Sequence, residues 1–248
     1  MSAATHFTLQ EPALDIVDAG DGRSDVGAVV DRSVDDVGAP PRRSAAARAV
    51  KRGEDLVGCL LALPLLVVVL PIVALVVRLD SSGPVFFRQR RVGRDGREFA
   101  MLKFRSMYTD AEARLDADPE LHAQWLAHDC KLPEEIDPRI TRVGRFLRRT
   151  SLDELPQVLN VLAGQMSLVG PRPIERRQIE HLYGDRAAWY EATKPGLTGL
   201  WQVSGRSTIQ GDARVALDIA YVRAWSPWRD LVLVLRTVPA VLRSDGAH

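Results

Sequence analysis

The sequence predicts a mainly helical α+β protein in which a soluble domain is attached to a membrane-embedded helix. An apolar run at residues 56–77 is long enough to enter a bilayer, and residues 81–248 combine segments of helical periodicity with a candidate strand. Residues 1–47 show no sustained periodicity. At 248 residues the chain has room for one domain with an appendage. We therefore divide it into a tail (1–47), a membrane segment (48–80) and a soluble domain (81–248).

The first 47 residues are rich in Asp, Ala, Gly and Ser, and we expect them to form a disordered or weakly ordered acidic tail. Within residues 1–40, eight acidic side chains accompany two arginines, a net charge of −6, so the remaining residues carry +7 of the overall +1. A basic body suits anionic partners such as phosphates or a lipid surface, and by charge alone nucleic acid fits as well. Residues 1–50 contain no apolar core of a signal peptide, and two cysteines are too few for a disulfide framework.

Residues 56–77 (LVGCLLALPLLVVVLPIVALVV) are 22 consecutive positions without a charge. At about 1.5 Å per residue a helix of this length crosses a hydrocarbon core. Basic clusters flank the run on both sides, at residues 42–52 and 78–97, although positive charge marks the cytoplasmic side. Pro64 and Pro71 each remove a helical hydrogen bond. We therefore expect a re-entrant hairpin, helix–break–helix, that enters and leaves by the cytoplasmic face and bends at one of these prolines.

Further segments of the soluble domain have a predicted structure. Residues 110–129 have the composition of a charged helix, residues 140–147 and 155–162 have helical periodicity, and residues 99–107 are a candidate strand. Residues 231–242 are apolar with arginines interspersed, which is typical of an interfacial helix or of a core helix.

Two adjacent carboxylates, Asp153 and Glu154, are the first candidates for chemistry. Ser151 lies three residues before Glu154, which predicts a capping box at the start of a helix. The apolar face of that helix is expected to consist of Leu155, Val158, Leu159 and Leu162. One role for the two acids is to cap the helix. An ionised carboxylate at a helix N-terminus can also hold a divalent cation or attack phosphorus. Arginines recur upstream at positions 139, 142, 145, 148 and 149, and a diphosphate with Mg²⁺ needs such guanidinium groups beside carboxylates.

Two turn-rich basic segments follow. Pro171 and Pro173 restrict the backbone on both sides of Arg172, so that its side chain projects from a stiff loop. Residues 194–199 (KPGLTG) and 202–206 (QVSGR) are typical of loops that approach phosphates closely. The sequence contains no G-x-G-x-x-G, Walker or serine-elbow motif, which excludes the common nucleotide-binding folds. The five histidines are scattered, and we interpret them as structural or surface residues.

Together these segments resemble the bacterial sugar transferase family, the monotopic polyprenyl-phosphate phosphoglycosyl transferases. The resemblance covers about residues 48–243, and no single motif carries it; its specificity comes from many motifs in one order. The matching segments are Lys51, Arg52 and Asp55, then residues 83–93 (GPVFFRQRRVG), 103–107 (KFRSM), 137–141 (DPRIT), 148–157 (RRTSLDELPQ), 160–162 (NVL), 166–173 (MSLVGPRP), 194–199 (KPGLTG) and 201–206 (WQVSGR).

The resemblance implies a catalytic domain at the cytoplasmic face of the bacterial inner (plasma) membrane. Asp153 would attack the β-phosphate of a UDP-sugar, release UMP and hold the phosphosugar covalently, and undecaprenyl phosphate would then accept the phosphosugar. Glu154 would complete the catalytic pair with Asp153, and Mg²⁺ would sit on Asp153. The phosphate-binding candidates are Arg148, Arg172, Lys103, Arg105 and Arg206.

The chain departs from the family in two respects. The family commonly has Ser-Pro at the hairpin bend, whereas Leu70 precedes Pro71 here, and Pro64 competes for the bend. Longer relatives carry several spanning helices before this core, so we expect a short, core-only form with its own tail.

Two other functions remain open: a non-catalytic scaffold of a polysaccharide assembly complex, and a membrane-tethered binder of polyanions or nucleic acid. We favour substrates over nucleic acid as partners. The sugar, the pathway and a homo-oligomeric state are not indicated by any motif.

Overall fold

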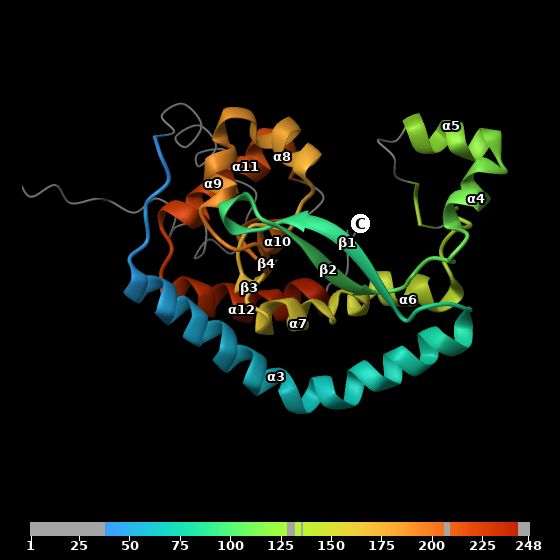
Figure 1. Ribbon diagram of the computed structural model, residues 1–248, viewed down its shortest axis with the longest axis horizontal. Coiled ribbons are helices and arrows are strands. Elements are labelled where there is room, and N and C mark those ends of the chain that lie inside the picture. Colours follow the sequence, from blue (N-terminus) through green and yellow to red (C-terminus); the bar gives the residue numbers. More distant parts are fainter. Residues whose placement is uncertain (1–37, 128–131, 135, 206–208, 243–248) are drawn as a thin grey trace, which may run out of the picture.

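The computed structural model describes residues 38–127, 132–134, 136–205 and 209–242 (Figure 1), so most of the expected tail, residues 1–37, lies outside the described part of the chain. The elements in chain order are α3 (Ala45–Asp80), β1 (Phe86–Val92), η1 (Arg94–Gly96), β2 (Glu98–Phe104), α4 (Ala111–Asp116), α5 (Pro119–Ala127), α6 (Arg142–Arg149), η2 (Leu152–Glu154), α7 (Gln157–Leu162), β3 (Ser167–Val169), α8 (Arg176–Tyr183), η3 (Gly184–Arg186), α9 (Ala187–Glu191), β4 (Gly196–Thr198), α10 (Leu200–Ser204), α11 (Gly211–Arg223) and α12 (Pro227–Leu242).

Helices dominate, and the strands form two small sheets, so the predicted mainly helical α+β class is confirmed. β1 and β2 pair antiparallel from Phe86↔Phe104 to Val92↔Glu98, while β3 and β4 pair in parallel. The largest buried apolar cluster surrounds α11, whose residues 215–222 are all buried because α8, α9 and α10 pack against it. Val169 and Ile174, on either side of the loop that carries Arg172, belong to this cluster.

The apolar run lies in α3, a single continuous helix with Pro64 and Pro71 inside it. Figure 1 shows α3 bent near its middle, with both ends turned toward the rest of the domain. The expected break into two helices is therefore not found. A proline removes one hydrogen bond and clashes with the preceding turn, and a bend accommodates both effects without ending the helix.

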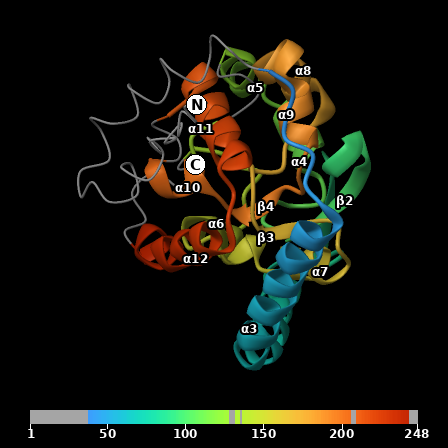
Figure 2. The same ribbon diagram turned by 90° about the vertical axis from the view of Figure 1, so that its left-hand side faces the viewer.

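α3 packs against the domain along one narrow stripe. Cys59, Leu66, Val73 and Val77 are buried on this stripe against elements that include α6 and α7. The other faces expose large apolar side chains along the whole run, Leu61 at 78 % among them. Figure 2, turned by 90°, shows α3 below the other elements. The helix therefore lies along one side of the domain and leaves most of its apolar surface uncovered.

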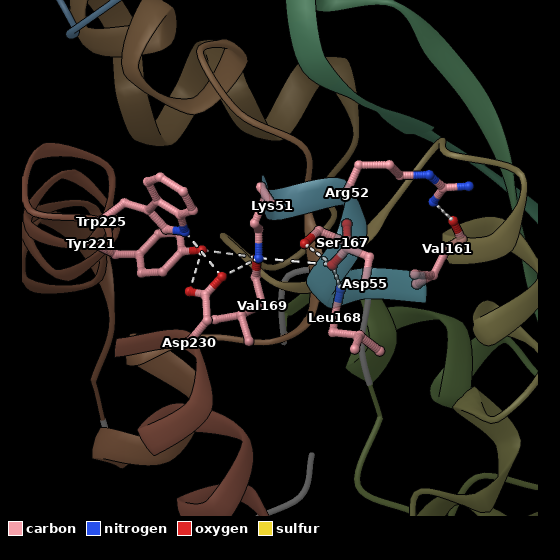
Figure 3. A network of polar contacts seen from close by, with 10 residues as sticks. All are labelled: Lys51, Arg52, Asp55, Val161, Ser167, Leu168, Val169, Tyr221, Trp225 and Asp230. Carbon is pink, nitrogen blue, oxygen red and sulfur yellow. Dashed lines mark hydrogen bonds and ion pairs between the residues drawn. The ribbon is translucent and has the colours of Figure 1, made fainter. Parts of the chain in front are cut away.

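Polar side chains in the first turns of α3 attach the helix to two distant elements (Figure 3). Arg52 donates hydrogen bonds to the carbonyl oxygens of Val161 and Leu162, at 2.6 and 2.7 Å, and so caps the end of α7. Asp55 accepts hydrogen bonds from the Ser167 hydroxyl at 2.7 Å and from the next backbone N–H at 2.9 Å, both on β3. Because α7 and β3 border the site described below, these contacts fix the site relative to α3.

A third attachment is a buried ion pair between Lys51 of α3 and Asp230 of α12. Asp230 also accepts a hydrogen bond from the Trp225 indole, and the Tyr221 hydroxyl lies 3.0 Å from its other oxygen. Removing one member of a buried ion pair leaves the other charge without compensation, which is costly even where the pair itself adds little stability.

The boundaries of several observed elements differ from those predicted from the sequence. The helix expected at 110–129 is divided into α4 and α5, because Pro119 starts a new helix and the Asp118 carboxylate caps it by accepting the N–H groups of Glu120 and Leu121. The strand expected at 99–107 is β2, with Met107 in a separate bridge to Ile140. The helices expected at 140–147, 155–162 and 231–242 correspond to α6, α7 and α12.

We predict that Asp230→Asn lowers the free energy of unfolding by about 3–5 kcal/mol, because Lys51 would stay buried without its main counter-charge. Asp212→Asn is the matched control, since Asp212 pairs with Arg186 at the surface and is 68 % exposed. It should cost less than about 1 kcal/mol. Thermal or denaturant unfolding of the full chain in one detergent measures both variants. Equal losses would contradict the structural role of the Lys51–Asp230 pair.

Candidate active site

Asp153 and Glu154 lie in η2, the short 3₁₀ turn between α6 and α7. Ser151 has a left-handed backbone (φ 55°) and its side chain makes no cap hydrogen bond, so the predicted capping box is wrong. The physical reason is the sharp turn out of α6, after which the Glu154 side chain points to a lysine rather than back to Ser151. The predicted apolar face is also wrong in part. Leu159 and Leu162 are exposed, while Gln157 and Asn160 are buried.

Glu154 is held by two cations from separate segments. Lys103 of β2 donates a hydrogen bond to its Oε1 at 2.9 Å, and Arg172 donates to the same oxygen at 3.0 Å. Burial alone would raise the pKa of Glu154, but the charges and hydrogen bonds of Arg172 and Lys103 outweigh it and lower the pKa to about 2. Glu154 is therefore ionised at any physiological pH.

Asp153 is buried beside this ion pair without a close partner of its own. Its nearest cation is Lys103, whose Nζ lies 3.9 Å from Oδ2, and within the described residues no donor makes a hydrogen bond to the carboxylate. Burial, helped by the charge of Glu154, outweighs the lowering effect of Lys103, Arg148 and Arg172, so that the pKa of Asp153 is raised to about 6. The result is a carboxylate that is ionised at neutral pH yet poorly stabilised, as a nucleophile or a cation ligand requires.

Asn160 aligns η2 with β2. Its amide donates to the Ala100 carbonyl at 2.8 Å, and its carbonyl oxygen accepts the Leu102 N–H at 2.9 Å. These bonds join α7 to β2 one residue before Lys103. The spacing between Lys103 and Glu154 is thus set by a buried amide on the helix that follows the carboxylates.

Close backbone contact between Gly170 and Gly196 positions the loop that carries Arg172. A Cβ atom on Gly196 would lie 2.1 Å from the Gly170 nitrogen, so only glycine fits there. The Gly196 N–H donates to the Pro171 carbonyl at 2.8 Å. As predicted, Arg172 projects from a short, restricted loop.

Arg148 reaches the site from α6. Its Nε donates to the Ser106 hydroxyl at 2.9 Å, and its guanidinium lies 3.6 Å from Glu134. Gly144 lets α6 approach closely, because a Cβ there would lie 2.0 Å from the Ser106 carbonyl oxygen. The structure thus brings Arg148, Arg172 and Lys103 to the two carboxylates.

One predicted phosphate-binding residue, Arg105, is not part of this cluster. Arg105 is buried and donates to the carbonyl oxygens of Ser81 and Pro84, both at 2.6 Å, and so holds the chain as it leaves α3. We therefore assign Arg105 to this turn rather than to a phosphate. Arg206 lies outside the described residues.

Arg91 and Gln157 were not among the residues predicted from the sequence. Together with Lys103, Arg172 and Glu154, the second acid of the Asp153–Glu154 dyad, they border a cavity of about 20 Å³, here called the dyad cavity; Asp153 itself does not line it. That volume holds roughly one water-sized species. Arg91 lies inside the motif at residues 83–93, but that motif also contains Arg88 and Arg90, and only the burial pattern along β1 shows which of the three turns inward. Among the described residues, no three His, Cys, Asp or Glu side chains gather as a metal site.

Comparison with known proteins places this chain in a family. The model of the family described as bacterial sugar transferase matches residues 46–244. The chain is 47 % identical over 205 residues to a protein of Erwinia amylovora named UDP-galactose-lipid carrier transferase, covering 81 % of this chain and 42 % of that protein. It thus spans about two fifths of that relative's length.

Shorter relatives match over most of their length. The chain is 41 % identical over 216 residues to the exopolysaccharide production protein ExoY of Rhizobium meliloti, covering 84 % of this chain and 94 % of that protein. It is 44 % identical over 207 residues to the UDP-glucose:undecaprenyl-phosphate glucose-1-phosphate transferase of Caulobacter vibrioides, covering 80 % and 72 %.

The raised pKa of Asp153 predicts a pH-dependent stability difference. A carboxyl whose pKa rises on folding binds its proton more tightly in the folded state, so its contribution to stability falls as pH rises from about 4 to 6 and stays lost above. Asp153→Asn removes this loss. We expect the variant to be more stable than the wild type at pH 7, by up to about 3 kcal/mol, with the difference shrinking toward pH 4.

Unfolding midpoints of both proteins between pH 4 and 7 check this. Asp218, whose pKa burial also raises to about 6, is unchanged in the variant, and its effect cancels in the difference. Asp185→Asn, at an exposed position, is the control. A difference that does not vary with pH would show that Asp153 does not titrate in this range.

Proposed function

Because the chain belongs to the bacterial sugar transferase family, we propose that it transfers a sugar-1-phosphate from a UDP-sugar to undecaprenyl phosphate, releases UMP, and so initiates the synthesis of a polysaccharide or glycoconjugate. The names of its relatives from Erwinia and Caulobacter support the donor and the carrier. The single observation that carries the proposal is the buried carboxylate of Asp153, placed beside Glu154 and its two cations.

The reaction proceeds as two displacements at the same phosphorus. An Asp153 oxygen attacks the β-phosphorus of the donor, the bond to the bridging oxygen breaks, and UMP leaves with that oxygen and its electron pair. The phosphate oxygen of the carrier then attacks the phosphosugar held on Asp153 and frees the carboxylate. The bond between sugar and phosphate is never broken, so the anomeric configuration is retained.

The surrounding residues stabilise the charge that moves in each step. Lys103 and Arg172 pair with Glu154 before substrate binds, and the oxygens of an incoming diphosphate can replace part of that pairing. Their charges, with that of Arg148, also favour the ionised form of Asp153. Glu154 keeps the two cations at fixed positions, and through them it orients the phosphate that Asp153 attacks.

Mg²⁺ fits this donor set. The buried carboxylate of Asp153 accepts no hydrogen bond from a described residue, and Mg²⁺ commonly binds one or two protein carboxylates and completes its shell with substrate phosphate and water. Asp153 would hold the ion, with Glu154 adjacent. When bound, it would neutralise charge on the diphosphate.

We further propose that the protein lies at the cytoplasmic face of the inner membrane, with α3 dipping into the bilayer and returning. α3 is long and apolar enough to cross a membrane by length and composition. However, its buried stripe is covered by the domain along its length, so a straight span would draw α6 and α7 into hydrocarbon. Neighbouring helices add exposed apolar side chains: Phe146, Leu159, Leu162, Trp228, Leu231 and Leu235.

We predict that Asp153→Asn reduces UMP release from a UDP-sugar panel with undecaprenyl phosphate by about a thousandfold or more, because an amide cannot form the covalent intermediate. Asp185→Asn, distant in sequence and exposed, should keep wild-type activity. Rapid quenching followed by intact-protein mass spectrometry should find one phosphosugar on the wild type and none on the variant. Turnover that survives in Asp153→Asn, or product that accumulates with no phosphosugar on the enzyme, would refute the assignment of the nucleophile.

A scaffold or polyanion binder gives a different result in the same assay. Either would bind without releasing UMP, and a polyanion binder would lose binding steeply as salt rises. The donor that supports turnover identifies the sugar.

The membrane arrangement predicts that both ends of α3 face the same compartment. Cysteines introduced as Ala45→Cys and Ser82→Cys, at exposed positions on either side of the run, should be labelled together by a membrane-impermeant maleimide only when the cytoplasmic face is accessible. Cys59 and Cys130 are replaced by alanine in this background. Labelling of the two positions from opposite sides would overturn the re-entrant arrangement.

A further inference from the structure

We propose that the nucleotide half of the donor binds in a second cavity, between β1 and the start of α8, and that Arg91 joins this cavity to the dyad. The cavity has a volume of about 280 Å³. That is ample for the leaving nucleoside monophosphate, whereas the dyad cavity of about 20 Å³ holds only a small group. The inference rests on the proposed function and assigns the part of the donor that the dyad cannot hold.

The two cavities lie along the same two chain segments. Arg91 borders both of them. The loop residues Arg172 and Pro173 border the dyad cavity, and Glu175 and Arg176, a few residues further on, border the larger one. The Val92 N–H donates to the Ile174 carbonyl at 3.0 Å and holds the two segments side by side. A diphosphate held by Lys103 and Arg172, the two cations of Glu154, can therefore place its other phosphate beside Arg91, at the edge of the larger cavity.

The larger cavity has the charge that a nucleotide needs. Four arginines and two glutamates border it, an excess of two positive charges: Arg90, Arg91, Arg176, Arg177, Glu98 and Glu175. Guanidinium groups bind phosphate through paired hydrogen bonds and also stack on the faces of bases.

Two of these arginines are fixed and two are available. Arg176 is held by Glu191 and by the Gly96 carbonyl. Arg91 lies 3.0 Å from Glu175, and its buried Nε makes no hydrogen bond with any described residue. Arg90 and Arg177 are exposed. The Arg90 side chain is 89 % accessible, and its ion pair with Glu98 is long, at 3.7 Å. Arg91 thus has an unused donor inside the site, and Arg90 and Arg177 can close over a ligand.

The position of the cavity separates the two substrates. Figure 1 shows α8 and the end of β1 that leads into η1 on the side of the domain away from α3, whereas α7, which follows the dyad, lies against α3. A water-soluble nucleotide can therefore enter and leave on the side facing away from the bilayer, and the lipid carrier can reach the same phosphorus from the side of α3. This arrangement lets UMP depart before the carrier arrives, as a two-step displacement requires.

The test uses the double variant Arg90→Ala/Arg177→Ala of the full chain in detergent or nanodiscs. We expect the Kd for UMP and the KM for the UDP-sugar that the wild type turns over to rise about tenfold or more, because two charge-assisted contacts to the nucleotide are lost. The KM for undecaprenyl phosphate should not change. Arg97→Ala is the matched control, since Arg97 is an exposed arginine of the same hairpin that does not border the cavity.

The outcomes separate this proposal from the proposed function. An unchanged Kd for UMP, or a rise confined to the KM of the carrier, would overturn the nucleotide site while leaving the transferase activity standing. If instead the wild type binds UMP, loses that binding in the double variant and turns over no UDP-sugar, the site stands and the activity fails. UMP binding is measured directly by calorimetry, so it does not depend on turnover.

Discussion

The site depends on the double ion pair of Glu154 with Lys103 and Arg172. These cations come from β2 and from the loop after β3, so a single carboxylate gathers segments that lie 51 and 18 residues away in the chain. Because Glu154 takes the hydrogen bonds of both cations, Asp153 is left buried with charge nearby, and no donor among the described residues makes a hydrogen bond to its oxygens. The two adjacent acids thereby acquire opposite properties: burial raises the pKa of Asp153 to about 6, and the paired cations lower that of Glu154 to about 2.

The framework around this ion pair explains the glycines and buried amides near it. Asn160 fixes α7 to β2, Gly144 lets α6 approach Ser106, and Gly196 brings its strand against the loop of Arg172. None of these residues carries a charge, yet each sets the distance between two segments of the site. A charged site of this kind needs a rigid frame, since Coulomb interactions and hydrogen bonds weaken when the partners are displaced by even an ångström.

Much of this was predictable from local sequence. The long apolar helix follows from 22 uncharged residues, and the restricted loop of Arg172 follows from its two flanking prolines. What could not be predicted depends on contacts between distant segments. Arg105 was expected at a phosphate and instead holds the end of α3, 24 residues earlier. Arg91 was passed over among similar neighbours, although its strand position turns it toward the site. Ser151 fitted a capping pattern, but the turn after α6 imposes a left-handed backbone on it.

Hydrogen bonds also link α3 to the candidate active site. Arg52 and Asp55 in its first turns hold the end of α7 and the start of β3, the two elements that flank the dyad and the loop of Arg172. Any displacement of α3 is therefore transmitted to both sides of the site. A helix that crossed the bilayer freely would gain nothing from such bonds, because its depth would be set by lipid alone. A helix fixed to the catalytic frame instead holds Asp153 at a constant height above its own apolar surface, which is what an enzyme must do if one substrate is anchored in the membrane and the other arrives from water.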